Sequence, residues 1–417
     1  MLKKCRLLVL PILILTCGLA IADEVPESFA ALPPDGKFEL NGALRFRYSN
    51  ENPARPNQSG QNAGLDTIIL GAKYDSNTLF GSVQWRFYGG AYPYTPTNGY
   101  MGNNAQIGSV NFPQEAYLGY KIDPNNSVTA GIIQTPFGIG RFWDSTFFEG
   151  IGFAMGIQDA YNMGVSWLHT DGPNKFDAAL LLGDAGNFVG PYGNDRYSSN
   201  ISMPGYQIGP ATLSPNVSGT SNIEKQSLVA RYTREISAGG FKHTPGLSAW
   251  YGFIQNTSTN SMGDRLYVSL FDSINYGQWN AKLALTPIII RPKNPSAVGD
   301  NVVTMGGYDG SYNMASRGLQ SSADISYTFA QALGPVTGIT PYLNYSRYDK
   351  SAQGFLATER YIGGVSFSWG KVFTAVEYRL GKNDPYTNPS GNYEQGLGRG
   401  GSNSWDKTLY ANVGYYF

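Results

Sequence analysis

The sequence contains sixteen segments in which apolar and polar residues alternate. A period of two is typical of β-strands, because successive side chains point to opposite faces. Short connections rich in Asp, Asn, Ser and Gly join alternate segments, as expected of tight turns. The expected strands span residues 37–48, 65–74, 79–88, 114–122, 127–137, 161–169, 175–183, 227–236, 246–256, 264–271, 278–290, 318–329, 339–348, 361–369, 372–380 and 408–417.

The remaining connections are long, and they alternate with the short ones along the whole chain. They cover residues 50–64, 91–112, 138–160, 185–225, 257–263, 291–317, 350–358 and 383–406. In an outer-membrane β-barrel, short turns lie on the periplasmic side and long loops lie outside. Closure satisfies every backbone group, which a hydrocarbon environment requires. The pattern therefore predicts an all-β fold, a 16-stranded antiparallel transmembrane β-barrel over residues 37–417, with strand 37–48 beside strand 408–417.

The last expected strand ends on an aromatic residue, Phe417. Apolar and polar positions alternate along it, with Leu409, Ala411, Val413, Tyr415 and Phe417 on one face and Thr408, Tyr410, Asn412, Gly414 and Tyr416 on the other. Chain termini usually fray in water, so an aromatic end inside a strand is unusual for a soluble protein. The stretch resembles the closing strand of bacterial outer-membrane barrels, and the resemblance implies that Tyr415 and Phe417 form an assembly signal. Taken alone, it also fits the last strand of a soluble sandwich.

Residues 1–22 have the features of a secretory signal peptide. A basic start precedes an apolar run at 7–15, and the small-x-small triplet at 20–22 fits a cleavage site. Cys17 follows Thr16 rather than a smaller residue, which argues against a lipoprotein. Both cysteines, Cys5 and Cys17, lie in this segment, so the expected mature chain has no disulfide and no thiol chemistry. Residues 23–36 are expected to form a periplasmic lead-in.

Charge and composition agree with a membrane barrel. The signal segment holds three of the 30 basic residues and none of the 30 acidic ones, which leaves a formal charge of −3 and argues against a nucleic-acid binder. Charged residues make up 14% of the chain, against a typical ~25%. Aromatic residues also reach 14%, and the mean hydropathy is −0.26. After residue 22, no apolar stretch approaches the ~20 residues of a transmembrane helix.

The third long connection, 138–160, is more apolar than the other loops. Its aromatic residues are Phe142, Trp143, Phe147, Phe148 and Phe153. A freely solvated loop rarely carries so much aromatic surface. We therefore expect this loop to fold into the barrel and to narrow the pore, with Arg141, Asp144 and Glu149 facing the passage. The alternative is an outer loop packed between subunits.

Residues 130–138, Ala-Gly-Ile-Ile-Gln-Thr-Pro-Phe-Gly, and residues 163–165, Met-Gly-Val, flank this loop. Here the chain resembles bacterial general and substrate-selective porins of 16 strands, and within that group the phosphate-selective porins O and P. The resemblance implies a homotrimer with an inward third loop, located in the outer membrane of a Gram-negative bacterium. Lipopolysaccharide, outer-membrane lipid and the barrel assembly machinery are the implied partners. Anion-selective members carry dense arginine and lysine at the constriction, whereas this loop offers Arg141 against three acidic residues.

Further charges face the lumen by strand parity. The basic ones are Arg45, Arg47, Lys73, Arg86, Arg231, Arg360 and Arg379, and the acidic ones are Glu39, Glu115, Asp324 and Glu377. A basic wall opposite an acidic loop would create a transverse field across the aperture, and rings of charge of this kind set ion preference. The alternative is that these residues form salt bridges that brace the wall.

Signals of enzymatic chemistry are weak. The two histidines, His169 and His243, both fall at or near short turns, and neither an HExxH motif nor a cysteine cluster is present. The glycine pattern at 396–401 lies in a Gly-rich loop rather than between a strand and a helix, so it does not indicate a dinucleotide site. We expect neither catalysis nor a bound metal or cofactor.

The sequence thus predicts a passive diffusion channel for small hydrophilic solutes or ions, anions among them. Sixteen strands enclose a lumen wide enough for an aqueous channel. A barrel that acts as an adhesin or structural scaffold through its long loops, such as 185–225, is the alternative function.

Overall fold

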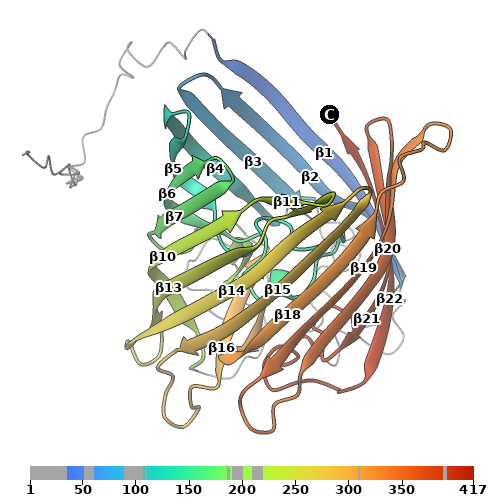
Figure 1. The fold of residues 1–417 in the computed structure, drawn as a ribbon. Helices are drawn as coiled ribbons and strands as arrows, with labels where there is room; N and C mark the ends of the chain where they lie inside the picture. Colours follow the sequence, from blue (N-terminus) through green and yellow to red (C-terminus); the bar gives the residue numbers. More distant parts are fainter. Residues whose placement is uncertain are drawn as a thin grey trace, which may run out of the picture.

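The computed structural model describes residues 35–50, 61–88, 107–108, 110–185, 188–189, 201–208, 219–308, 310–387 and 392–417. The expected signal peptide, 1–22, and most of the expected lead-in lie outside the described residues. Within the described part, sixteen antiparallel strands form the barrel wall (Figure 1). They are β1 Lys37–Asn50, β2 Gln61–Asp75, β3 Leu79–Tyr88, β4 Val110–Asp123, β5 Asn126–Gln134, β6 Tyr161–Asp171, β7 Asn174–Leu181, β10 Asn222–Arg234, β13 Gly246–Asn256, β14 Met262–Tyr276, β15 Trp279–Arg291, β18 Arg317–Tyr327, β19 Val336–Lys350, β20 Thr358–Trp369, β21 Val372–Lys382 and β22 Trp405–Tyr416.

The barrel closes between its first and last strands, as the sequence predicts. β1 pairs with β22 from Ala43↔Tyr416 to Asn50↔Leu409. Beyond the ladder, the N–H of Gly42 donates to the carbonyl oxygen of Phe417 at 2.9 Å, and the N–H of Phe417 donates back at 3.1 Å. The terminal residue therefore completes the seam and leaves neither backbone group unpaired.

Side chains follow the expected parity on the closing strand. Val413 and Phe417 are 41% and 47% exposed on the outer face, whereas Thr408 and Asn412 are fully buried on the inner face. The same alternation appears on β1, where Phe38, Leu40 and Phe46 are exposed. The outer face of these two strands thus carries apolar side chains, a pattern typical of barrels whose outer face contacts lipid. Among the described residues, no helix is long and apolar enough to span a membrane.

Most expected boundaries differ from the structure by a few residues, and two of the differences have a clear physical reason. The turn expected at 272–275 is part of β14, which continues to Tyr276, and the chain reverses at Gly277 with a φ of 55°. Left-handed backbone at a tight turn favours glycine. The strand expected at 127–137 ends at Gln134, two residues before Pro136, which has no N–H for the ladder. The turn after β10 also contains a small hairpin, β11 Ile236–Ala238 with β12 Phe241–His243.

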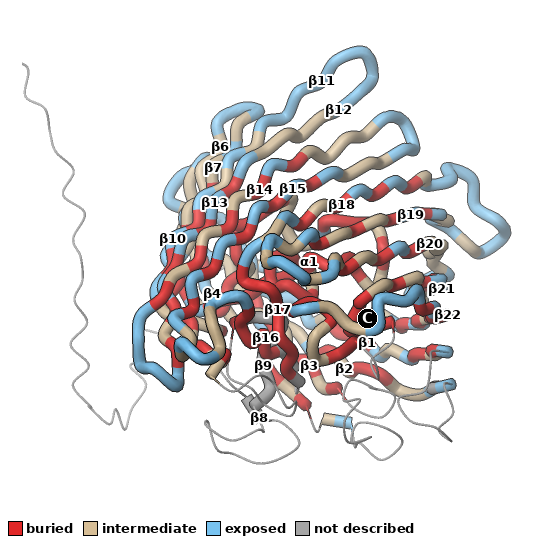
Figure 2. Tube along the Cα trace, turned by 90° about the horizontal axis from the view of Figure 1, so that it is seen from below, coloured by how far each residue is buried: buried red, intermediate tan, exposed pale blue. Residues whose placement is uncertain are grey.

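Two expected loops contain strands of their own. β8 Phe188–Val189 and β9 Ile201–Ile208 lie in the connection after β7, and β16 Val302–Tyr308 and β17 Gly310–Ala315 lie in the connection after β15. They form a second sheet in the order β17-β16-β9-β8, in which Met305 pairs with Ile208. In Figure 2, β16 and β17 lie within the ring of barrel strands and are largely buried.

An apolar core fills the side of the lumen next to β10, β13, β14 and β15. Trp250, Tyr267 and Ile288 point inward from these strands and pack with Trp143 from the third loop and Tyr312 from β17. All five are almost fully buried. The hydroxyl of Tyr312 donates to the carbonyl oxygen of Ala154 in the third loop. This core fills one side of the lumen, and a cavity lies beside it, lined by residues of β1, β2, β3 and β22 and by residues of β15, β19, β20 and β21.

Candidate functional site: the constriction of the lumen

Loop 3, residues 135–160, crosses the lumen from its base between β5 and β6. The N–H of Thr135 donates to the carbonyl oxygen of Ala160 at 2.9 Å and closes the base. The N–H of Gly138 reaches the Oγ of Ser248 on β13, also at 2.9 Å. Gly138 has a φ of 60°, and a Cβ there would collide with the indole ring of Trp143. The Gly-Ile-Gly start of the loop therefore lets the chain turn directly onto the inner wall, which confirms the inward third loop.

The far wall holds loop 3 through its backbone N–H groups. The carboxylate of Glu377 on β21 accepts bonds from the N–H of Phe147 at 2.6 Å and of Phe148 at 3.2 Å. Tyr342 on β19 donates its hydroxyl to the same carboxylate at 2.8 Å. The Oγ of Ser346, also on β19, accepts the N–H of Ile151, the first residue of the short helix α1, Ile151–Ala154. Loop 3 is therefore fixed at its tip as well as at its base.

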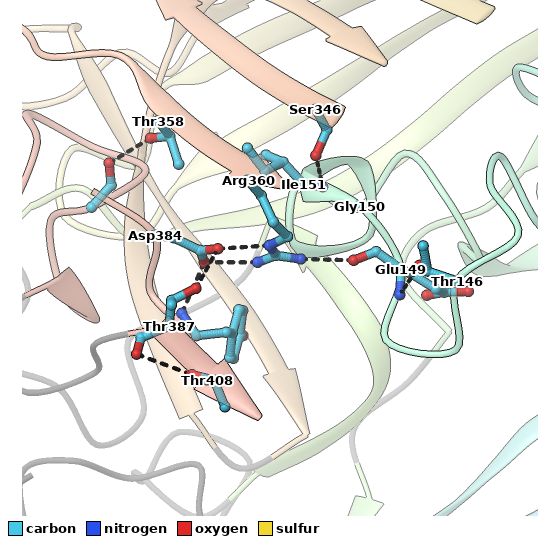
Figure 3. A network of polar contacts seen from close by, with 12 residues as sticks. Thr146, Glu149, Gly150, Ile151, Ser346, Thr358, Arg360, Asp384, Thr387 and Thr408 are labelled. Carbon is cyan, nitrogen blue, oxygen red and sulfur yellow. Dashed lines mark hydrogen bonds and ion pairs between the residues drawn. The ribbon is translucent and has the colours of Figure 1, made fainter. Parts of the chain in front are cut away.

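A buried ion pair supports the tip of the loop (Figure 3). Arg360 on β20 donates from Nε and Nη2 to the two carboxylate oxygens of Asp384, at 2.6 Å and 2.7 Å. Its Nη1 donates to the carbonyl oxygen of Glu149 at 2.9 Å. Burial opposes ionisation of Asp384, but the guanidinium group and the N–H of Tyr386 outweigh that effect and lower the pKa of Asp384 below its ordinary value. The arginine thus joins loop 3 to the eighth long connection.

The acidic residues of loop 3 bind the loop itself. Asp144 accepts bonds from the N–H of Gly150 at 2.9 Å and from Nε2 of Gln158 at 3.0 Å, as well as from Thr146. Asp159 accepts bonds from Nε of Arg141 at 2.9 Å, and from Gln114 and Tyr161. These carboxylates therefore hold the shape of the loop through hydrogen bonds, and Asp159 also forms an ion pair with Arg141.

Glu149 differs from its two acidic neighbours. Its backbone has a φ of 69°, which is uncommon for a residue other than glycine, and bonds to Thr146 and Arg360 hold both of its backbone polar groups. Burial raises the pKa of the Glu149 carboxyl group well above its usual range, and the nearby charges of Asp159 and Asp144 raise it further. Arg141 and Arg86 oppose these effects without reversing them. The carboxyl group is therefore neutral over a wider pH range than an exposed glutamate.

The open part of the lumen is a cavity of about 660 Å³ between loop 3 and the wall. Six of the residues expected at the constriction border it, namely Arg45, Arg47, Arg86, Arg141, Asp144 and Glu149. Asp66, Asp159 and Lys282 add charge to the same cavity. The cavity therefore joins charged residues of β1, β2, β3 and β15 to those of loop 3.

Arginines of the wall lie close to aromatic rings. The guanidinium carbon of Arg45 is 5.3 Å from the ring centre of Phe147 and 5.7 Å from that of Tyr416. That of Arg47 is 5.4 Å from the ring centre of Tyr410, and its Nη1 is 3.5 Å from Asp66. Such cation–π contacts orient a guanidinium group and leave it charged. The wall thus presents cations in fixed positions.

Five other expected constriction residues do not border the cavity. Arg231 pairs with Asp177 at 2.9 Å, Arg360 binds Asp384, and the guanidinium group of Arg379 lies over the ring of Phe148. The contacts of these three arginines agree with the alternative interpretation, in which the charged residues brace the wall, rather than with a place at the aperture. Glu115 accepts a bond from Ser82 at 2.7 Å, and Lys73 lies near the short-turn end of β2.

Two charged residues of the cavity were missed in the sequence. Lys282 has the same parity as the buried residues Ala284 and Ile288 of β15, so counting along the strand could have found it. Asp66 has outward parity, but β2 has an irregular register where Arg45 pairs with Thr67 and Phe46 pairs with Leu65. Asp66 is the extra residue of this bulge and turns inward. The alternation of residues along β2 gives no sign that Asp66 faces the lumen.

Metal ligation finds no support in the described residues, where no group of three or more His, Cys, Asp or Glu side chains could hold a metal ion. No family model matches the chain, and no curated protein matches it in sequence.

Solved structures show the likeness of the fold. Salmonella typhi OmpF, in a complex with daunomycin, is 12% identical, covers 92% of this chain and 98% of its own, and has a TM-score of 0.55. The outer membrane channel DcaP of Acinetobacter baumannii is 13% identical over 92% and 97%, with a TM-score of 0.55. The anion-selective porin from Comamonas acidovorans is 13% identical over 92% and 100%, with a TM-score of 0.53. The expected likeness to 16-stranded outer-membrane porins is confirmed for the fold.

Proposed function

We propose that the chain forms a water-filled pore in the outer membrane of a Gram-negative bacterium and that the pore admits small hydrophilic solutes, with a preference for anions. The porin fold supports the channel at the level of architecture. The preference for anions rests on the charges around the cavity.

The observation that carries this preference is a difference between the basic and the acidic groups that border the cavity. The cations Arg45, Arg47, Arg86, Arg141 and Lys282 border the cavity. Of the bordering carboxyl groups, those of Asp144 and Asp159 are engaged by donors of loop 3 and its surroundings, and that of Glu149 has a raised pKa. When Glu149 is neutral, five cations face three anions, so the aperture has a positive field. Charged rings of this kind set ion preference.

A planar bilayer with a KCl gradient tests the proposal. The purified protein is expected to give stepwise conductance and a reversal potential of the sign that anion permeation produces. Replacing Arg45 and Arg86 by Glu, in a double variant R45E/R86E, should move the reversal potential towards cation permeation. R347Q is the matched control, because Arg347 pairs with Asp349 on the outer face of β19 and does not border the cavity. Folded protein without conductance steps would contradict the channel.

The expected partners belong to the same proposal. A homotrimer, surrounding lipopolysaccharide, assembly by the barrel assembly machinery and an assembly signal at Tyr415 and Phe417 are all implied by the resemblance to porins. Exposed apolar residues on the outer face, such as Leu40 and Leu118, support contact with lipid or with neighbouring subunits. Native mass spectrometry in detergent would test the trimer. The absence of catalysis also stays a prediction.

The adhesin or scaffold alternative also stays a prediction. Much of the connection between β7 and β10 lies outside the described residues. Its strand β9 pairs with β16 rather than with a partner outside the barrel. Shortening the connection at 209–218 should abolish adhesion but leave conductance intact if the alternative is correct.

A further inference from the structure

One aromatic residue of loop 3 is placed differently from the others. Loop 3 is described in full, and within it Trp143 is buried while Phe147, Phe148 and Phe153 are partly buried. Phe147, for example, stacks between Phe373 and Tyr410, with ring centres 6.2 Å and 6.1 Å away. All four of these phenylalanines border the cavity, but only Phe142 is exposed there, with 52% of its surface accessible. It presents an apolar ring to the water of the lumen.

The ring of Phe142 is held in place by its neighbours. Lys282 on β15 donates from Nζ to the carbonyl oxygens of Phe142 and Asp144, at 3.3 Å and 3.1 Å. The next residue, Trp143, is 1% exposed and donates its indole N–H to the carbonyl oxygen of Gly140 at 3.0 Å. The backbone on both sides is therefore anchored. A ligand that contacts the ring does not have to order the loop first, which lowers the entropic cost of binding.

Cationic groups lie beside this ring. The guanidinium carbon of Arg141 is 5.0 Å from the ring centre of Phe142. Its Nε–H donates to Asp159, and a guanidinium group carries four further N–H donors. The ammonium group of Lys282 lies at the carbonyl group of the same residue. An apolar ring and fixed positive charge therefore occur together at one wall of the cavity.

We infer that this wall binds aromatic carboxylates, with the ligand ring against Phe142 and its carboxylate at Arg141. The inference rests on the proposed channel function and names a class of solute for it. Guanidinium groups bind carboxylates through paired, charge-assisted hydrogen bonds. Aromatic rings gain from offset or edge-to-face contact beyond the area that they bury. The cavity volume of about 660 Å³ lies within the ~300–1,000 Å³ of small-molecule sites.

A small inorganic anion does not use this arrangement. Chloride or phosphate gains from the cations but leaves the ring of Phe142 in water. An aliphatic acid without a ring, such as acetate, also pairs with Arg141 but covers little of the ring. The inference therefore predicts discrimination among anions that have the same charge and differ only in their apolar part.

Block of the chloride current in a planar bilayer tests the inference, with benzoate, cyclohexanecarboxylate and acetate as probes. For the unmodified protein, the half-blocking concentration of benzoate is expected to be the lowest and that of acetate the highest. Replacing Phe142 by Ser should raise the benzoate value by roughly two- to tenfold and leave the acetate value unchanged. F142Y should retain benzoate block, and F142L should lose the difference between benzoate and cyclohexanecarboxylate.

F329S is the matched control, because Phe329 is 46% exposed in the turn between β18 and β19 and does not border the cavity. If chloride steps are present but benzoate and acetate block equally, the inference is wrong and the channel stands. Benzoate block that F142S and F142L leave unchanged would also overturn the inference. If the unmodified protein gives no chloride steps, the channel itself is wrong. Should F142S not fold, the comparison of F142L with F142Y decides alone.

Discussion

Arg360 and Asp384 show how a charge inside the barrel can serve structure. The side chains of Arg360 and Asp384 are 1% and 0% exposed, and three donor bonds of the arginine are satisfied. Removing one partner of such a pair leaves a buried, uncompensated charge, which typically costs about 3–5 kcal/mol.

The variant R360Q is therefore expected to lose about 3–5 kcal/mol of stability, measured by urea unfolding of the folded protein in detergent. The double variant R360L/D384L should recover part of that loss, because it removes both charges. A single variant as stable as the unmodified protein would show that water reaches Asp384.

Glu149 leads to a prediction about pH. Since burial and the neighbouring carboxylates raise its pKa, the carboxyl group stays protonated to a higher pH than an ordinary glutamate and ionises as the pH rises through the raised value. Ionisation adds a negative charge to the cavity, so the preference for anions should fall as the pH rises. E149Q should keep the preference of the protonated form across the same range. Reversal potentials in low salt, where the screening length is ~10 Å at 0.1 M, measure the effect. Equal pH profiles of the two proteins would contradict it.

Alternation along the strands was sufficient to predict which side of the wall many residues of the site face. Arg45, Arg47 and Arg86 were placed in the lumen by counting alone, and they border the cavity. Counting could not reveal which inward arginines have partners. The partner of Arg360 is Asp384, in a Gly-rich connection whose path over the lumen depends on long-range packing. Asp66 was missed because a bulge reverses its side, and a bulge depends on the neighbouring strand.

At the scale of the element, loop 3 is fixed by anchors of unequal strength. Glu377 accepts two backbone N–H groups of the loop and a tyrosine hydroxyl group, whereas Ser346 accepts one N–H. Each lost bond to a charged acceptor costs about 1.5–3 kcal/mol, against about 1 kcal/mol for a neutral one.

We expect E377A to give larger fluctuations of the single-channel current than S346A, because the tip of loop 3 gains freedom in the first variant. Single-channel recording at a fixed voltage measures the difference. Current noise of the same size in both variants would show that the apolar packing of Phe147 and Phe148, rather than Glu377, fixes the loop.

The expected elements were most accurate where turns and alternation agree. β3 and β13 have the predicted bounds, and each is flanked by turn residues on at least one side. The strands β9, β16 and β17 were missed. β9 and β16 pair across about a hundred residues, and the short strand β16, Val-Val-Thr-Met-Gly-Gly-Tyr, shows no regular alternation of polar residues.

The whole molecule depends on the seam between β1 and β22. Phe417 donates and accepts one backbone bond with Gly42, and its ring stacks with Tyr415 at 6.0 Å. Deleting Phe417 removes both bonds and the terminal aromatic group. We expect the fraction of protein that reaches the folded barrel in cells to fall severalfold, measured as the heat-modifiable band on gels. F417Y keeps the ring and should assemble normally. Normal assembly of the deletion variant would show that Phe417 is not part of the proposed assembly signal.

The far anchors of loop 3 also make the narrowing of the lumen depend on the later strands of the barrel. The loop comes from the first half of the chain, yet its tip is bound by Ser346, Arg360 and Glu377, which follow some two hundred positions later. Without β19, β20 and β21, these three bonds cannot hold the tip of loop 3 across the lumen. The tip of loop 3 can therefore take its anchored position only when β19, β20 and β21 are in place. The closed wall and the narrowed lumen thus depend on the same three strands.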